Sequence, residues 1–230
     1  MSKISIVIPV LNEEKFIGKL LHHIDANSNS SNISDIIVVD GGSTDKTKDI
    51  VACFADVQLL NSEKGRAKQM NLGAKASNGE VLYFLHADAL PPKNFDILIL
   101  DDISKENKAG CFRMQFDSNH WWLRLASWLT QFNWRPCRGG DQSQFITREL
   151  FKDIGGYDED YLIYEDNILI NELYARKQFV VINSKIRTSA RQYKKVGIWK
   201  LQYHFWTIYV KRWLGADAND IYHYYKNHVK

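Results

Sequence analysis

The strongest constraint on the fold is the alternation of two patterns over the first 85 residues. Short apolar runs lie at 4–8, 36–40, 57–60 and 80–85, and segments with apolar residues at helical spacing separate them. Continuous β-branched runs of this length are typical of parallel strands that are buried on both faces. The alternation predicts an α/β fold with a largely parallel sheet and right-handed crossovers.

The same patterns predict the boundaries of individual elements. A first helix is expected after the strand at 4–8, with Asn12 as its N-cap and with Glu13 and Glu14 in its first turn. Further helices are expected at about 65–76 and 165–177, and further strands at 109–116 and 179–182. No linker or internal repeat interrupts the chain. We therefore predict one α/β domain over residues 1–195, followed by a helical extension over 196–230.

Composition limits the class of protein. The chain has 230 residues, of which 45% are hydrophobic and 25% are charged, as in soluble globular proteins. A net charge of +3 is too small to indicate a nucleic-acid partner. The three cysteines form no CxxC pair, which favours a reducing compartment. We expect a cytoplasmic protein that binds no nucleic acid, and no window is apolar enough for a spanning helix.

Polar residues follow four of the predicted strands, where ligands bind in open parallel sheets. They lie at Pro9–Glu13, Asp40–Ser43, Gly65–Lys68 and His86–Asp88. Each group also has a purely structural interpretation: Asp40 before two glycines suits a turn, and Arg66 and Lys68 suit a solvated helix face. The chain contains neither G-x-G-x-x-G nor G-x-x-x-x-G-K-[ST], which excludes the two commonest nucleotide cradles in their usual form.

Four segments in order carry a family resemblance. "SIVIPVLNEEKFIGKLL", "DIIVVDGGSTDKT", "GRAKQMNLGAKASNGEVLYFLHAD" and "GGYDEDYLIYEDNIL" resemble family 2 glycosyltransferases of the GT-A fold, over roughly residues 3–190. More narrowly, "GRAKQMN", "FLHAD", "GDQ" and "TSAR" resemble the radical-SAM/selenodomain-associated glycosyltransferases. The resemblance implies a mixed, mostly parallel sheet flanked by helices. It also implies inverting transfer of a sugar from a nucleotide-diphosphate donor, of the UDP type, to a hydroxyl acceptor.

The resemblance also implies donor-binding residues. The nucleotide would contact Pro9, Leu11, Glu13, Asp40, Gly65 and Arg66, with Asp40 at the edge of the base.

The D-x-D metal motif of the family falls on His86-Ala87-Asp88. Asp88 takes the position of the aspartate that binds Mn²⁺ or Mg²⁺, ions that prefer oxygen ligands. His86 replaces the first aspartate and adds no negative charge. It either ligates the metal, donates to a phosphate oxygen, or is a hydrogen-bonded residue at the end of the strand.

Catalysis by inversion requires a base on the acceptor side. The resemblance gives this role to Asp166, beside Glu165; by context alone, the two acidic residues equally suit a helix N-terminus. Asp141 and Gln142 are expected on the acceptor side. Arg191 either closes over the diphosphate or belongs to a solvated basic run.

The segment 197–215 is largely aromatic and aliphatic, with a narrow polar stripe of Lys200, His204, Thr207 and Lys211. Such a helix packs against its own domain, against a second subunit or against a membrane interface. It is too short and too basic to span a bilayer. Many members of the family use lipid-linked acceptors, so peripheral membrane contact remains an alternative to a homodimer.

Two other classes of function compete with glycosyl transfer. A nucleotidyltransferase uses a similar sheet and metal, but usually has a glycine-rich basic loop where this chain has "PVLNEE". A non-catalytic nucleotide-sugar binding module is the other alternative, because the first aspartate of the metal motif is replaced by His86.

Overall fold

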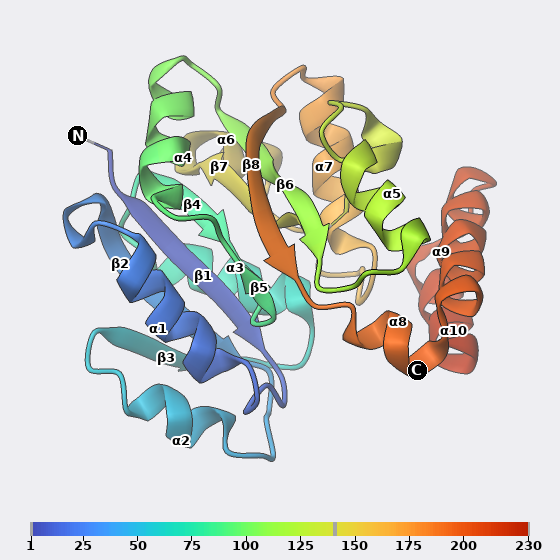
Figure 1. Ribbon diagram of the computed structural model, residues 1–230, viewed down its shortest axis with the longest axis horizontal. Helices are drawn as coiled ribbons and strands as arrows, with labels where there is room; N and C mark the ends of the chain where they lie inside the picture. Colours follow the sequence, from blue (N-terminus) through green and yellow to red (C-terminus); the bar gives the residue numbers. More distant parts are fainter. Residues whose placement is uncertain (1, 140–141, 230) are drawn as a thin grey trace.

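A computed structural model describes residues 2–139 and 142–229, and its centre is a single mixed sheet (Figure 1). The strand order is β3-β2-β1-β4-β7-β6-β8-β5. The four strands from β3 to β4 run parallel to one another, as do β6 and β8. Strand β7 is antiparallel to both of its neighbours, β4 and β6, and β5 is antiparallel to β8. The strands are β1 (Ile4–Val10), β2 (Ile33–Asp40), β3 (Val57–Asn61), β4 (Val81–Phe84), β5 (Ala89–Leu90), β6 (Ala109–Phe116), β7 (Gln144–Thr147) and β8 (Val180–Thr188). The predicted mixed, mostly parallel sheet is confirmed.

Helices cover both faces of this sheet and bury two separate cores. One face carries α1 (Ile17–Asn27), α2 (Thr47–Ala52) and α4 (Phe95–Ser104). The other carries α3 (Arg66–Ala76), α6 (Arg148–Ile154) and α7 (Glu165–Ala175). Successive side chains of β1 point to opposite faces, so Ile6 and Ile8 enter the first core and Val7 enters the second. This is why the strand is apolar at every position.

Helix α3 lies unusually close to the sheet because of Gly73. A Cβ atom at Gly73 would lie 2.4 Å from Cγ1 of Val7 and 3.1 Å from Cγ2 of Val39. Only a residue without a side chain leaves room for this approach. The close packing holds α3 directly beneath the carboxyl ends of β1 and β2.

The predicted start of the first helix is wrong. Helix α1 begins at Ile17, and Asn12 adopts a left-handed conformation with φ of 57°. Its side chain accepts a hydrogen bond from the backbone N–H of Thr44 instead of capping the helix. Glu13 and Glu14 therefore precede the helix and lie in the loop after β1. The strand expected at 179–182 is β8, which is longer than predicted. It continues to Thr188, past a register shift in its pairing with β6.

The C-terminal part adds four helices beside the sheet, among the residues that the structure describes (Figure 1). They are α5 (Trp121–Leu129), α8 (Arg191–Val196), α9 (Ile198–Trp213) and α10 (Ala218–His228). Helix α9 lies along α10 and buries Leu201, His204 and Ile208. Ile208 of α9 and Ile221 of α10 pack in one core cluster with Tyr161, which lies in the segment that leads into α7. None of the described helices is long and apolar enough to cross a membrane.

Candidate active site

The carboxyl ends of β2, β1 and β4 lie next to one another in the sheet. From β1 the chain proceeds to β2 and β3 on one side, and then returns to place β4 on the other side. This reversal is a topological switch point, and the crevice outside it is where open α/β sheets bind ligands. The ends of these three strands and the loops after them carry six of the predicted site residues: Pro9, Leu11, Glu13, Asp40, His86 and Asp88.

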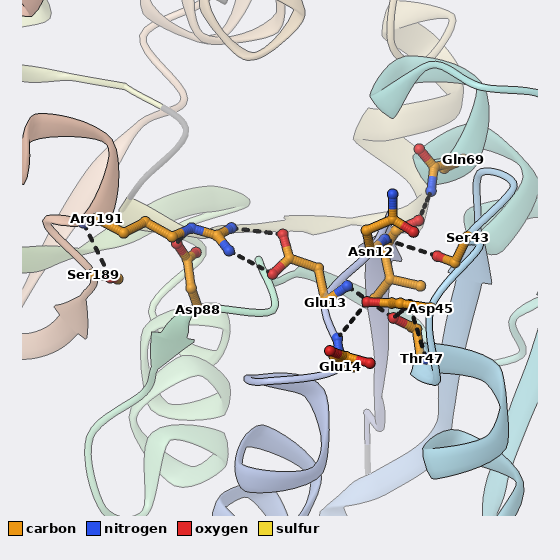
Figure 2. Close-up of polar contacts among 11 residues, drawn as sticks. Asn12, Glu13, Glu14, Ser43, Asp45, Thr47, Gln69, Asp88, Ser189 and Arg191 are labelled. Carbon is orange, nitrogen blue, oxygen red and sulfur yellow. Dashed lines mark hydrogen bonds and ion pairs between the residues drawn. The ribbon is translucent and has the colours of Figure 1, made fainter. Parts of the chain in front are cut away.

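The loops after β1 and β2 are tied together by hydrogen bonds (Figure 2). The backbone N–H of Asn12 donates to Ser43 Oγ at 2.9 Å, and that of Glu13 donates to Thr47 Oγ1 at 2.8 Å. From α3, Gln69 donates its amide to the carbonyls of Val10 at 2.9 Å and Val39 at 2.7 Å. Pro9, Leu11 and Glu13, the residues predicted to lie along a nucleotide, therefore belong to the end of β1 and to a loop held in place by hydrogen bonds.

Asp40 ends β2 and is almost fully buried. Its carboxylate accepts the backbone N–H of Gly42 at 3.0 Å and that of Ser43 at 2.9 Å. These bonds fix the turn, as the structural interpretation of the sequence expected. Contact between Asp40 and a base edge stays a prediction.

Arg191, the first residue of α8, makes an ion-pair bridge between the segments after β1 and β4 (Figure 2). Its two Nη atoms lie 2.7 and 2.6 Å from the carboxylate oxygens of Glu13, and its Nε lies 2.9 Å from Oδ2 of Asp88. The guanidinium also lies 4.6 Å from the ring centroid of Phe16. Arg191 thus pairs with two carboxylates, and its closure over a diphosphate stays a prediction.

The donor set near Asp88 fits a divalent cation held mainly by substrate. Mg²⁺ and Mn²⁺ are commonly bound by one or two carboxylates, with phosphate oxygens and water completing the shell. The residues described include no group of three or more His, Cys, Asp or Glu side chains that could hold a metal alone. Asp88 is only 17% exposed at its side chain and lies beside a second carboxylate, Glu13. Asp88 and Glu13 would thus supply the one or two carboxylates that such an ion takes from the protein.

The acidic pair at the N-terminus of α7 faces residues from two other motifs. Asp166 Oδ2 lies 3.9 Å from Nε2 of His86, the first position of the D-x-D register. Glu165 is fully buried, and its Oε1 lies 2.7 Å from Nε of Arg66 at the start of α3. The two side chains form an ion pair, and neither oxygen of Glu165 accepts a hydrogen bond of good geometry. His86 is therefore directed at Asp166, and Arg66 at Glu165.

Burial dominates the electrostatics of Glu165. It raises the pKa of this carboxyl to about 7, with Arg66 acting in the opposite direction and the charge of Asp166 adding to the rise. The Tyr157 hydroxyl is also buried, and burial together with the charges of Asp166 and Glu165 raises its pKa. The N-terminus of α7 thus forms a desolvated acidic centre.

Of the two residues predicted on the acceptor side, Asp141 and Gln142, the structure describes only Gln142. Asp141 lies outside the described residues. Gln142 is buried, and its amide oxygen accepts from Nη1 of Arg138 at 2.8 Å while its nitrogen donates to the carbonyl of Cys137 at 2.6 Å. Contact between either residue and an acceptor stays a prediction.

Gly65 is the residue before α3 and has a φ of 148°, a value that disfavours any side chain. It places Arg66 as the first residue of the helix, within reach of Glu165.

Sequence reasoning missed the contacts that position the site. Asn12 and Ser43 belong to the polar groups that the sequence indicated, and Gln69 was not singled out. Local spacing does not reveal the network that these three residues form, because their partners come from other elements. Tyr209 of α9 donates to Oδ1 of Asn167, next to Asp166. The C-terminal extension therefore supports the helix that carries the acidic pair.

The profile of glycosyl transferase family 2 matches residues 5–169 of this sequence. The chain belongs to glycosyl transferase family 2. This confirms the resemblance seen in the sequence; membership of the radical-SAM/selenodomain-associated subset stays a prediction.

Curated relatives are similar over part of their length. The chain is 28% identical over 198 residues to the probable glycosyltransferase YdaM of Bacillus subtilis (strain 168), covering 76% of this chain and 47% of that protein. It is 33% identical over 102 residues to a dolichyl N-acetyl-alpha-D-glucosaminyl phosphate 3-beta-D-2,3-diacetamido-2,3-dideoxy-beta-D-glucuronosyltransferase of Methanococcus voltae, covering 41% of this chain and 32% of the relative. The match thus spans a third to a half of these relatives.

Solved structures share the fold. S. aureus TarS 1–349 in complex with UDP has a TM-score of 0.67 at 20% identity, covering 82% of this chain and 60% of that one. The mannosyltransferase PcManGT from Pyrobaculum calidifontis, in complex with GDP-Man and Mn²⁺, has a TM-score of 0.72 at 17% identity, covering 94% and 66%. The GT-A architecture expected from the sequence is confirmed.

The raised pKa of Glu165 predicts a pH-dependent stability. Its pKa is about 7 when folded against 4.5 as a model value, so the folded protein retains a proton that the unfolded chain releases in this window. The contribution is fully present below pH 4.5 and is lost as pH rises through 7. Glu165→Gln should therefore be more stable than wild type above pH 7, by ~3 kcal/mol, and similar to it near pH 4.5.

Urea unfolding at a series of pH values measures this difference. Glu172→Gln is the matched control, because Glu172 is exposed on the same helix and should leave the profile unchanged. The prediction is wrong if the free energies of unfolding of wild type and Glu165→Gln change in parallel with pH. Glu165 would then ionise as easily in the folded protein as in the unfolded chain.

Proposed function

We propose that the protein is an inverting glycosyltransferase that moves a sugar from a UDP-sugar to a hydroxyl acceptor. One observation supports the proposal: two groups of charged residues meet beside the segment that follows β4. In the first group Arg191 pairs with Glu13 and Asp88, and this group would lie on the diphosphate side. Asp166, which faces His86, would be the carboxylate on the acceptor side. His86 and Asp88 both belong to the segment after β4, so both groups contact it.

The fixed loops after β1 and β2 support nucleotide binding. Their hydrogen bonds leave the backbone from Pro9 to Glu13 pre-organised, which lowers the entropy that a bound nucleotide must overcome. Asp40 shapes the adjoining turn. TarS was crystallised with UDP and with UDP-GlcNAc, and PcManGT with GDP-Man, which supports a nucleotide-sugar donor here.

Asp88 would hold the divalent cation, together with diphosphate oxygens. When bound, Mn²⁺ or Mg²⁺ supplies positive charge that stabilises the departing nucleoside diphosphate. Arg191 provides a second positive charge at the same place, and its fork geometry suits phosphate as well as carboxylate. His86 is directed at Asp166 and contributes to orienting that carboxylate.

Asp166 acts as the general base. Its carboxylate accepts the proton of the acceptor hydroxyl while the hydroxyl oxygen bonds to the anomeric carbon. The bond from that carbon to the diphosphate breaks on the opposite face, which inverts the configuration. Glu165, buried and paired with Arg66, positions the start of α7 and so the base.

The acceptor is a hydroxyl compound, and a lipid-linked one stays a prediction. We propose that the enzyme works in the cytoplasm, a location consistent with the three free cysteines of the chain.

The metal role predicts a cation-dependent effect of UDP on thermal stability. At about 100 Kd a ligand adds about 2.7 kcal/mol to the folded state. UDP with Mn²⁺ should therefore raise Tm by several degrees, UDP in EDTA should raise it less, and Asp88→Asn should remove the difference. Asp101→Asn is the control, because it removes an exposed carboxylate that pairs with Lys105 on α4, away from Arg191. An equal UDP-induced shift with and without EDTA contradicts the role of Asp88.

The base role predicts a selective loss of turnover. Asp166→Asn preserves the shape of the side chain but cannot accept the proton, so turnover should fall by about 10²–10⁴ while donor affinity barely changes. UDP release from a panel of UDP-sugars, with sugar and lipid hydroxyl acceptors, measures turnover, and titration calorimetry measures affinity. Glu172→Gln on the same helix should retain full turnover.

A folded Asp166→Asn protein with wild-type turnover would remove Asp166 from the mechanism. Wild-type protein that binds UDP-sugars but never releases UDP would instead support the binding-module alternative.

A further inference from the structure

All seven tryptophans of the chain lie in one region, namely in α5, in the segment that follows it and in α9. Six of them are largely exposed, and Trp213 is 85% exposed. Monomeric soluble proteins rarely leave contiguous apolar surface of this kind uncovered.

The exposed residues of α9 form a single stripe. Trp199, Tyr203, Trp206, Val210 and Trp213 are spaced by four, three, four and three residues, which places them on one helix face. The opposite face is the buried one that contacts α10 and the segment before α7. Packing of α9 on its own domain therefore accounts for only half of its apolar surface.

Helix α5 continues the stripe across the gap between elements. The ring of Trp121 lies 5.7 Å from that of Trp199, and the ring of Trp122 lies 5.4 Å from Trp199 and 5.9 Å from Trp206. We call the surface made by Trp121, Trp199, Tyr203, Trp206, Val210 and Trp213 the aromatic face.

Exposed basic side chains lie beside the aromatic face. Residues 191–216 contain no Asp or Glu, and Lys195 and Lys200 are exposed there. The other basic residues of this segment have partners: Arg191 pairs with Glu13 and Asp88, Lys194 pairs with Asp117, and Lys211 and Arg212 lie over the rings of Tyr224 and Tyr161. Helix α5 contributes Arg124 and no acidic residue. It also lines a cavity of about 710 Å³ whose wall includes Arg113, Lys185 and Arg187, against a single acidic residue, Asp117.

We propose that the aromatic face docks on the surface of an anionic lipid bilayer. Trp and Tyr favour the boundary between hydrocarbon and headgroups, because their rings are apolar and their polar atoms reach water. The surrounding Lys and Arg residues complement anionic headgroups, each worth about 1 kcal/mol near such a surface. The contact is interfacial, since no described helix is suited to span.

A second copy of the chain fits the aromatic face less well. A two-fold interface brings the same patch of each subunit together, so the exposed Arg124, Lys195 and Lys200 would face basic residues of the other copy. Like charges in contact oppose association.

Intrinsic fluorescence tests the proposal, since every tryptophan lies in α5, the segment after it or α9. The full-length protein is titrated with vesicles of phosphatidylcholine alone and with vesicles containing about one third phosphatidylglycerol. The anionic vesicles should shift the emission to the blue and co-sediment with the protein, and higher ionic strength should weaken both effects. Neutral vesicles should bind far less.

Two kinds of variant identify the surface. Tyr203→Ser with Trp213→Ser removes exposed side chains and should reduce partitioning by tenfold or more, as an order of magnitude. Lys195→Gln with Lys200→Gln should reduce it about fivefold for each residue. Ile97→Ser, on α4 and 50% exposed, removes apolar surface elsewhere and should leave partitioning unchanged. Far-UV circular dichroism checks that each variant is folded.

The proposal is overturned if wild-type protein fails to bind anionic vesicles, or if the Tyr203→Ser, Trp213→Ser protein binds them as well as wild type. It is also overturned if light scattering shows a wild-type dimer that these two substitutions dissociate, because the aromatic face would then join two copies. None of these outcomes depends on donor binding or turnover, so the proposed glycosyl transfer is tested separately.

Discussion

At the carboxyl edge of the sheet, the guanidinium of Arg191 pairs with Glu13 after β1 and with Asp88 after β4. These carboxylates would repel one another without a cation beside them. Arg191 is 43% exposed at its side chain, so the pairing stabilises the fold by only about 1 kcal/mol. Its larger effect is geometric, because it joins two strand ends to the first residue of α8 and so fixes where the C-terminal helices begin.

The ion pairs of Arg191 would also have to change when a nucleotide-sugar donor and its cation bind. A divalent cation at Asp88 has to compete with Arg191 for the same carboxylate, and a diphosphate offers Arg191 a new anionic partner. Donor binding and rearrangement of the bridge are therefore coupled under the proposed function. The acidic centre at the start of α7 is held separately, by Arg66 and by the contact of Tyr209 of α9 with Asn167, so Asp166, the proposed base, would keep its position during this exchange.

Much of the fold and several site positions could be predicted from local sequence. Strands such as 4–8 are continuous apolar runs, and the polar residues that follow them reach one edge because parallel strands end together. The partners of these residues could not be predicted. Arg191 and Glu13 are 178 positions apart, and their pairing depends on where β8 ends. Asn12 looked like a helix cap because the amide that it binds belongs to a neighbouring loop.

The central claim is that a nucleotide diphosphate binds outside the carboxyl ends of β1, β2 and β4, and the direct test is to find where it binds. A uridine diphosphate with an azido group on the base, irradiated in the presence of Mn²⁺, labels whichever segments lie beside the base. We expect mass spectrometry to find the label in peptides containing residues 9–14 or 40–47. Label confined to residues 113–119 and 185–187, around the basic cavity beside α5, would contradict the account.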